Sequence, residues 1–193
     1  MRQARVNVLL FKRFFAAIFA AAVFSVFLFP SQAAAFNTGV GVGVYIPGSD
    51  MSNTYDPGVD VYAYMSFNMV PTLLDFRIQA DWYNAKGKGS ILSKNDTDLK
   101  FSAVGGEALV VLAPTIIPVL KPYVGAGWGV YNGTIEVGGE SESKWGNGLV
   151  AVAGVGVEVV IVRIGIDGKY FINTISGDDY GGYGVGLSAS IVF

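Results

Sequence analysis

The chain has 193 residues, with 13 lysines and arginines, 15 aspartates and glutamates, no histidine, no cysteine and a formal net charge of −2. The absence of cysteine excludes a disulfide framework and thiol chemistry. The absence of histidine excludes Ser–His–Asp catalysis and removes the commonest metal ligand. An acidic chain without a cluster of basic residues is also a poor partner for nucleic acid.

Residues 1–35 predict a cleaved signal peptide for Sec-type export. Four basic residues precede an uncharged apolar run over 14–29, and a proline ends that run. The small residues Ala33 and Ala35 then suit signal peptidase, so we expect cleavage before Phe36. A retained membrane anchor is the alternative, but 16 apolar residues are fewer than the ~20 that a spanning helix needs.

Residues 36–193 predict a single all-β domain. The mean hydropathy of the chain is +0.47, yet no stretch after residue 35 reaches the ~18 consecutive apolar residues of a spanning helix. Apart from helices, only a closed barrel crosses hydrocarbon, with every second residue facing lipid. The sequence therefore predicts an eight-stranded antiparallel transmembrane β-barrel. It carries nine basic and fifteen acidic residues, a net charge of −6.

Eight segments have the alternating pattern of strands: 36–46, 59–68, 74–83, 99–112, 122–131, 149–160, 163–174 and 183–193. The third is the clearest, since apolar residues at even positions alternate with mostly polar residues at odd positions. The fourth is less regular. If Glu107 points inward, Lys100 and Ser102 share the parity of the lipid-facing residues and must lie above the membrane. The expected lipid-facing residues of this strand are Val104, Ala108, Val110 and Leu112.

The connections alternate between two kinds. Polar loops are expected at 47–58, 84–98, 132–148 and 175–182, and shorter, more apolar turns at 69–72, 113–121 and 161–162. Long polar loops at one end and short turns at the other are typical of outer-membrane barrels. With the amino terminus starting in the periplasm, the polar loops fall outside the cell.

Three segments carry a resemblance to a known family. They are Lys121 to Tyr131 (KPYVGAGWGVY), the Gly-Val repeats after Phe36 and the terminal residues Ser190 to Phe193. Together they resemble the small outer-membrane barrels of the OmpA, OmpX, opacity-protein and OmpW type. The resemblance implies location in the bacterial outer membrane, contact with outer-membrane lipid and lipopolysaccharide, and a monomer.

The resemblance also implies an assembly signal on the last strand. A carboxy-terminal phenylalanine on an alternating strand resembles the signal read by the barrel-assembly machinery, after delivery by periplasmic chaperones. The residues that match it here are Tyr183, Leu187, Ile191 and Phe193.

Charged residues on the inward parity form the candidate site. The inward residues are Asp60, Asp75, Arg77, Asp81, Glu107, Glu158, Arg163, Asp167 and Lys169. Paired carboxylates could serve acid–base catalysis. An eight-stranded barrel is filled by side chains, however, and charges buried there must be paired, which favours a salt-bridge plug.

We expect the plug to comprise Arg77, Glu107, Glu158, Arg163, Asp167 and Lys169. Arg77 would be its hub, paired with Glu107 on the adjacent strand, and Glu158 and Asp167 would lie at a similar height.

Aromatic residues near the strand ends predict two membrane-interface girdles. The outer girdle is expected to contain Trp82, Tyr83, Trp128, Tyr131, Tyr180 and Tyr183, and the inner one Phe67 and Phe193.

The glycines keep strict period two and do not form a nucleotide-binding G-x-G-x-x-G loop. Acidic loop segments at 95–98 and 136–142 lack EF-hand spacing and are interpreted as solvated charge, so no cofactor or metal is expected.

Two functions remain open. The first is a non-enzymatic barrel with a structural or surface-interaction role, whose interior is plugged. The alternative is a conduit for small hydrophobic molecules, by analogy with OmpW. Lipid hydrolysis is disfavoured by the missing histidine. A charge-filled interior favours the first function, whereas a continuous apolar cavity opening into lipid favours the second. The inward residues include many charges and few large apolar groups, which favours the first.

The mature protein is expected to begin at Phe36, because Ala33 and Ala35 form the cleavage site. Amino-terminal sequencing of the protein from outer-membrane fractions checks this. Recovery of a chain that still begins at Met1 would contradict it.

Overall fold

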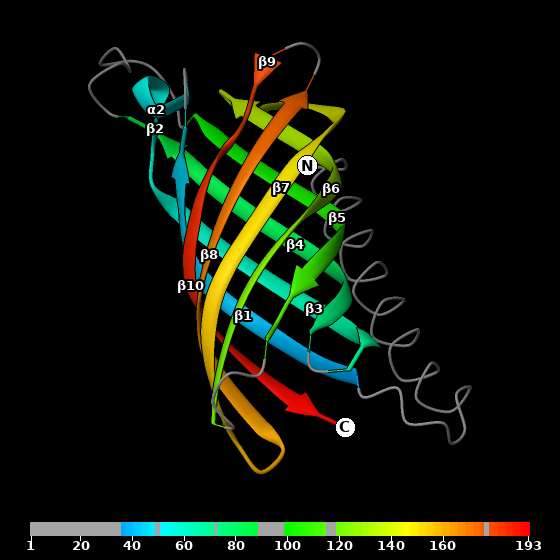
Figure 1. Cartoon of the computed structure of the whole chain (residues 1–193). Coiled ribbons are helices and arrows are strands. Elements are labelled where there is room, and N and C mark those ends of the chain that lie inside the picture. The colour runs from blue at the N-terminus through cyan, green and yellow to red at the C-terminus, as the bar shows by residue number, and fades with distance from the viewer. Residues whose placement is uncertain (1–35, 49–50, 72, 89–98, 115–118, 176–177) are drawn as a thin grey trace. The chain divides into compact units, whose positions relative to one another are not determined.

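Eight long antiparallel strands form a closed ring. The computed structural model describes residues 36–48, 51–71, 73–88, 99–114, 119–175 and 178–193. Within them, the long strands are β1 (Phe36–Pro47), β3 (Gly58–Val70), β4 (Leu74–Gly87), β5 (Lys100–Leu112), β6 (Leu120–Val137), β7 (Glu140–Val159), β8 (Val162–Ile175) and β10 (Gly182–Val192). Neighbours in this order pair with each other, and β10 also pairs with β1, which closes the ring (Figure 1). The predicted eight-stranded antiparallel barrel is confirmed.

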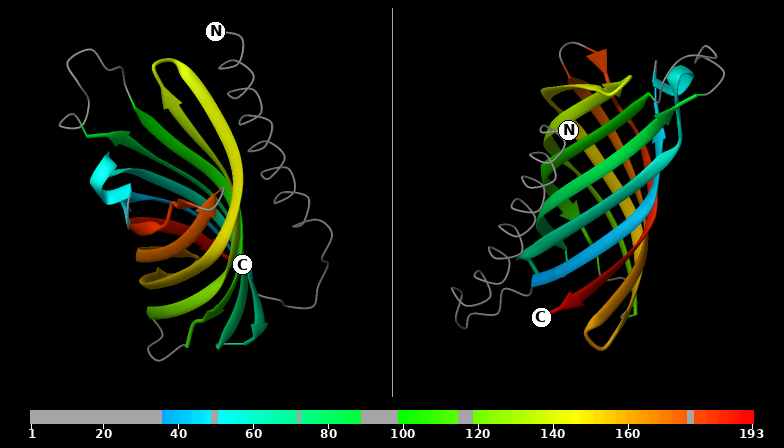
Figure 2. Two further views of the ribbon diagram at one scale, coloured as in Figure 1. Left: turned by 90° about the horizontal axis from the view of Figure 1, so that it is seen from above. Right: turned by 180° about the vertical axis from the view of Figure 1, so that it is seen from behind.

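The two ends of the barrel differ. One end, which we call the loop end, carries the helix α2 (Met51–Thr54), the short strands β2 (Tyr55–Asp56) and β9 (Asp178–Asp179), and the β6–β7 hairpin (Figures 1 and 2). The opposite end, the turn end, carries the three short connections between long strands. Among the described residues, no helix has the length and hydropathy of a membrane-spanning segment. The predicted signal peptide, residues 1–35, lies outside the described residues.

Alternate residues of each strand face opposite sides of the wall, as the pleat of a strand requires. On β1 the side chain of Val42 is 56% exposed, whereas that of Tyr45 is completely buried. On β10 the side chain of Leu187 is 60% exposed and that of Ser190 is 4% exposed. The exposed side chains are mostly Val, Ile and Leu, so the outside of the ring is apolar.

The side chains of β5 also alternate between the two sides of the wall. The sequence predicts their directions only on the condition that Glu107 points inward. Glu107 is buried inside the ring, while Val110 and Leu112 are exposed on its outside. Lys100 and Ser102 share this outward parity and lie opposite Lys86 and Asn84 of β4, toward the loop end. Their expected position above the membrane stays a prediction.

The predicted polar loop over 132–148 is wrong, because β6 and β7 continue through it as a hairpin. The hairpin turns at Gly138 and Gly139, whose positive φ angles of 62° and 87° suit glycine. Polar residues hold most of the outward positions here, with Trp145 as an exception, so the apolar alternation ends before the strands do. Backbone pairing needs no apolar side chains once the strands leave the lipid.

Inward glycines make room for tyrosine rings on the neighbouring strand. A Cβ atom added to Gly41 would lie 2.1 Å from the ring of Tyr62, and one added to Gly39 would lie 2.7 Å from the ring of Tyr64. The glycine strings of β1 are therefore a packing device for a narrow barrel.

Candidate functional site: the barrel interior

Lys169 of β8 is the centre of the interior charge network. Its ammonium Nζ lies 3.5 Å from Oδ2 of Asp60 and 3.7 Å from Oε1 of Glu107, and it also donates a hydrogen bond to Oδ1 of Asp81. These carboxylates come from β3, β5 and β4, on the far side of the ring from β8. All four residues are buried, so water does not solvate their charges. The ammonium group and the carboxylates stabilise one another instead.

Neutral side chains complete this network. The amide of Gln79 donates hydrogen bonds to Oδ2 of Asp81 (2.9 Å) and Oε2 of Glu107 (3.2 Å). The hydroxyl of Tyr131 on β6 donates a hydrogen bond to Oε1 of Glu107. The network therefore joins strands β3 to β6 with β8 through the lumen. Asp81 and Glu107 each accept more than one hydrogen bond or ion-pair contact, as buried carboxylates need.

The predicted pairing of Arg77 with Glu107 is wrong. The register places Arg77 opposite Leu109 and puts Glu107 opposite Gln79, two residues nearer the loop end. The Arg77 guanidinium instead lies between two tyrosine rings, with its Cζ 4.4 Å from the centroid of Tyr64 and 4.8 Å from that of Tyr123. Within the described residues Arg77 forms no ion pair, so its charge is held by cation–π contacts and the hub is Lys169.

The other three predicted plug residues form separate contacts. Arg163 and Glu158 pair with each other at the turn end, with Nη2 2.6 Å from Oε2 and Nε 3.1 Å from the same oxygen. Asp167 accepts a hydrogen bond from the hydroxyl of Tyr62. The six predicted residues all line the interior, but they divide among several contacts along the barrel. The predicted similar height of Arg77, Glu107, Glu158 and Asp167 is wrong for Glu158, which lies next to the β7–β8 turn.

Four tyrosines and Gln79 also belong to this site, although none of them is among the six predicted residues. Tyr62, Tyr64, Tyr123 and Tyr131 hold or cover charged groups, and Gln79 bridges two carboxylates. Their inward parity was visible in the sequence. Tyr and Gln are neutral, so the rule that buried charges are paired does not point to them, although both are suitable donors for a buried carboxylate.

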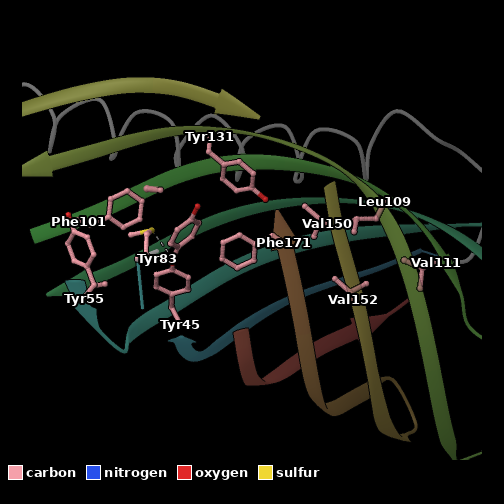
Figure 3. Close-up of a cluster of buried hydrophobic side chains, with 13 residues drawn as sticks. Tyr45, Tyr55, Tyr83, Phe101, Leu109, Val111, Tyr131, Val150, Val152 and Phe171 are labelled. Atoms are coloured by element: carbon pink, nitrogen blue, oxygen red, sulfur yellow. Dashed lines mark hydrogen bonds between the residues drawn. The ribbon is translucent and has the colours of Figure 1, made fainter. Parts of the chain in front are cut away.

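Toward the loop end the interior is aromatic. We call Tyr45, Tyr55, Tyr83, Phe101, Tyr131 and Phe171 the aromatic cluster (Figure 3). Ring centroids are 4.7 Å apart for Tyr45 and Tyr83, and 5.0 Å apart for Tyr83 and Phe171. The rings of Tyr45 and Phe171 are also stacked. These buried rings contradict the expectation that the interior holds few large apolar groups.

The aromatic cluster also corrects the outer girdle. Tyr83 and Tyr131 are each 1% exposed, because they share the inward parity of Asp81 and Gly129. Tyr180 is half-buried and stacks on Phe101, with centroids 5.3 Å apart. Among the predicted outer-girdle residues, Trp82, Trp128 and Tyr183 keep the outward parity. Phe67 and Phe193, predicted for the inner girdle, lie at the turn end on the outward parity.

A small cavity of about 20 Å³ lies beside the charge network. Its lining includes Asp60, Arg77 and Asp167, each of which has one buried polar atom without a hydrogen-bond partner in the described protein. A volume of this size accommodates about one water molecule. In the described part of the chain, no group of three metal-ligating side chains is placed to hold a metal ion.

The residues of the predicted assembly signal lie on the outside of β10 and, for Phe193, directly after its end. Tyr183, Leu187, Ile191 and Phe193 are all exposed, and the ring of Phe193 stacks on that of Phe36 at 4.6 Å. Recognition of this surface by the assembly machinery stays a prediction.

A ring of eight strands with an apolar outside and a filled inside is the architecture of small outer-membrane barrels. The model of the outer membrane protein beta-barrel domain matches residues 19–193. The chain belongs to this family. Membership places the barrel in the bacterial outer membrane, so its eight strands are transmembrane strands.

Several solved structures of outer-membrane proteins share the fold of this chain at low sequence identity. Neisserial surface protein A matches with a TM-score of 0.60 and 15% identity, over 84% of this chain and 100% of that chain. Ail, the attachment invasion locus protein of Yersinia pestis, in complex with the heparin analogue sucrose octasulfate, matches with a TM-score of 0.58 and 16% identity over the same shares. The amino-terminal barrel domain of Pseudomonas aeruginosa OprF matches with a TM-score of 0.51 and 12% identity, again over 84% and 100%. None of the curated proteins compared with the chain matches it.

Replacing Lys169 is expected to destabilise the barrel far more than replacing an exposed lysine. Lys169→Met leaves Asp60, Asp81 and Glu107 without their shared cation, a loss that typically costs about 3–5 kcal/mol. Lys86→Met, on the outside of β4, is the matched control and is expected to change little. Urea unfolding of the protein in lipid vesicles gives the free energies.

A double-mutant cycle separates this interaction from a general packing defect. Lys169→Met combined with Asp81→Asn is expected to lose less stability than the sum of the single losses, because the two groups are in contact. Strictly additive losses would refute the pairing.

Proposed function

We propose that this protein is a non-enzymatic outer-membrane barrel with a structural or surface-interaction role, which it performs through its outer wall and its loop end. The observation that carries the proposal is the filled interior. The Lys169 network occupies the middle of the lumen, and the aromatic cluster occupies it toward the loop end.

The filled interior supports this role over that of a conduit. An eight-stranded ring is only wide enough for its own side chains. The cavity beside the network holds about 20 Å³, and charged residues contribute to its lining. A conduit for small hydrophobic molecules needs a continuous apolar path into the lipid, and a cavity of this size does not supply one. The OmpW-like alternative is therefore not favoured.

The chemistry of the interior supports a non-enzymatic role. The buried carboxylates of Asp60, Asp81 and Glu107 contact Lys169 across the lumen, where a substrate has no room to approach them. The sequence has no histidine to act as a general base for a nucleophilic serine.

The β6–β7 hairpin is the best candidate for contact with the outside world. It continues beyond the apolar wall and exposes Glu140, Glu142 and Lys144 in the aqueous region, together with Trp145, which is 71% exposed. Ail was solved with a heparin analogue, a polyanion. With Glu136 included, the hairpin carries three acidic groups and one basic group, so a polyanion is a poor partner for this hairpin.

The outer wall favours lipid as the main partner. Its exposed Val, Ile and Leu residues suit acyl chains, including those of lipopolysaccharide in the outer leaflet. The closed ring leaves no unpaired strand edge among its eight strands, which is consistent with a monomer. Periplasmic chaperones and the barrel-assembly machinery are the expected partners during biogenesis.

Planar-bilayer recordings test the plugged interior. The pure folded protein is expected to show no large, stable conductance, because the Lys169 network and the aromatic cluster occupy the lumen. A porin recorded in the same apparatus is the positive control, and heat-modifiable mobility on gels confirms that the protein was folded. Steady porin-like currents would overturn the proposal, and swelling of protein-containing liposomes by small apolar solutes would favour the conduit instead.

A further inference from the structure

Three residues around the interior cavity each have one buried polar atom without a hydrogen-bond partner in the described protein. The atoms are Oδ1 of Asp60 on β3, Oδ1 of Asp167 on β8 and Nε of Arg77 on β4. The other carboxylate oxygens are in contact with protein. Oδ2 of Asp60 lies 3.5 Å from Nζ of Lys169, and Oδ2 of Asp167 accepts a hydrogen bond from the hydroxyl of Tyr62. The residues around the cavity therefore leave two acceptors and one donor without a partner.

These atoms need a partner inside the barrel. Asp60 is 3% exposed and Arg77 is 5% exposed, so bulk solvent hardly reaches them. The tyrosine rings beside Arg77 stabilise its charge, but they leave Nε without an acceptor. Buried polar groups in native proteins are almost always hydrogen-bonded, either to the protein or to ordered water. A small molecule in the cavity would provide the partners.

The cavity has room for one such molecule. Its volume is about 20 Å³, and ~10–15 Å³ is enough for one water molecule. Gly184 of β10 is part of the lining. A Cβ atom at this position would lie 2.8 Å from Oδ2 of Asp60, so a residue without a side chain leaves the space that the carboxylate occupies.

Hydrogen bonding and charge favour water as the occupant. The molecule has to donate to two carboxylate oxygens and accept from one N–H, and a buried water molecule typically makes about three hydrogen bonds. A metal cation cannot accept a hydrogen bond from Arg77, and it would lie beside the positive charges of Arg77 and Lys169. A halide cannot donate to Asp60 and Asp167, and it would lie beside their negative charges.

We propose that the cavity binds one ordered water molecule, which donates hydrogen bonds to Oδ1 of Asp60 and Oδ1 of Asp167 and accepts one from Nε of Arg77. The water links β3, β4 and β8 inside the lumen. It joins the Lys169 network to the contact between Tyr62 and Asp167, so that the two form one hydrogen-bonded network. Arg77 reaches two carboxylates through this water, although it forms no direct ion pair among the described residues.

A crystal structure of the folded protein, at a resolution that shows ordered water, tests the proposal. One density peak is expected in the cavity, within about 2.5–3.2 Å of all three atoms. A second crystal is grown in rubidium bromide, because both ions scatter anomalously, and no anomalous signal is expected at the peak. The absence of a peak, or a peak out of hydrogen-bond range of any of the three atoms, would overturn the proposal. An anomalous signal there would replace the water by an ion and would also overturn it.

Unfolding measurements test the same point in solution. The free energy of urea unfolding in phosphatidylcholine vesicles is expected to be equal in lithium, sodium, potassium and rubidium chloride at one concentration, since every buffer supplies water. Binding of a cation to the folded state would raise its stability in the salt of that cation. A dependence on the cation that Asp167→Asn abolishes would place an ion in the cavity and refute the proposal.

Discussion

Closure of the sheet between β1 and β10 is the constraint on which the rest of the structure depends. Inside hydrocarbon there is no water to satisfy backbone N–H and C=O groups, so a sheet can cross only if it has no free edge. The pairing of β1 with β10 over residues 37–47 and 182–192 supplies the missing edge partner. Once closed with eight strands, the ring has a narrow lumen that its own side chains must fill.

The composition of the interior follows from this narrowness. Tyrosine rings fit where the neighbouring strand has glycine, as at Gly41 beside Tyr62. Charged groups are tolerated because Lys169 lies opposite three carboxylates, and Gln79 and Tyr131 donate further hydrogen bonds to Asp81 and Glu107. Such a buried network is weak support for net stability, but removal of one member leaves uncompensated charge. Its geometric effect is to connect β8 with β3, β4 and β5 in one register.

The faces of the strands could be predicted from the sequence because the side-chain period of a strand is two. Once Phe76 and Ile78 were assigned to lipid, Arg77 had to point inward, and the structure agrees. The partner of Arg77 could not be predicted in the same way. Which inward residues meet depends on the stagger between strands and on contacts across the lumen, as for Lys169 and Glu107, and no local pattern encodes either. Parity also places Tyr83 and Tyr131 inside the barrel. The predicted girdle was based instead on the position of these two residues near the strand ends.

The ends of the strands were the least predictable part. Apolar alternation reports the portion of a strand that lies in lipid, and it stops where β6 and β7 enter water near Val130 and Leu149. Backbone pairing continues to the glycine turn because hydrogen bonding does not depend on the polarity of the side chains. The structure therefore extends farther at the loop end than the hydrophobic pattern indicates.

The register of the β1–β10 closure can be measured by disulfide cross-linking in the folded protein. Val42 and Leu187 are directly opposite each other across this pair of strands, and antiparallel partners have Cα atoms about 4.5–5.5 Å apart, within disulfide range. The account predicts rapid cross-linking of a Val42→Cys, Leu187→Cys variant in lipid vesicles, and none for Val42→Cys with Ile191→Cys, four residues farther along β10. Failure of the first pair to cross-link, or equal cross-linking of both, would contradict a closed ring in this register.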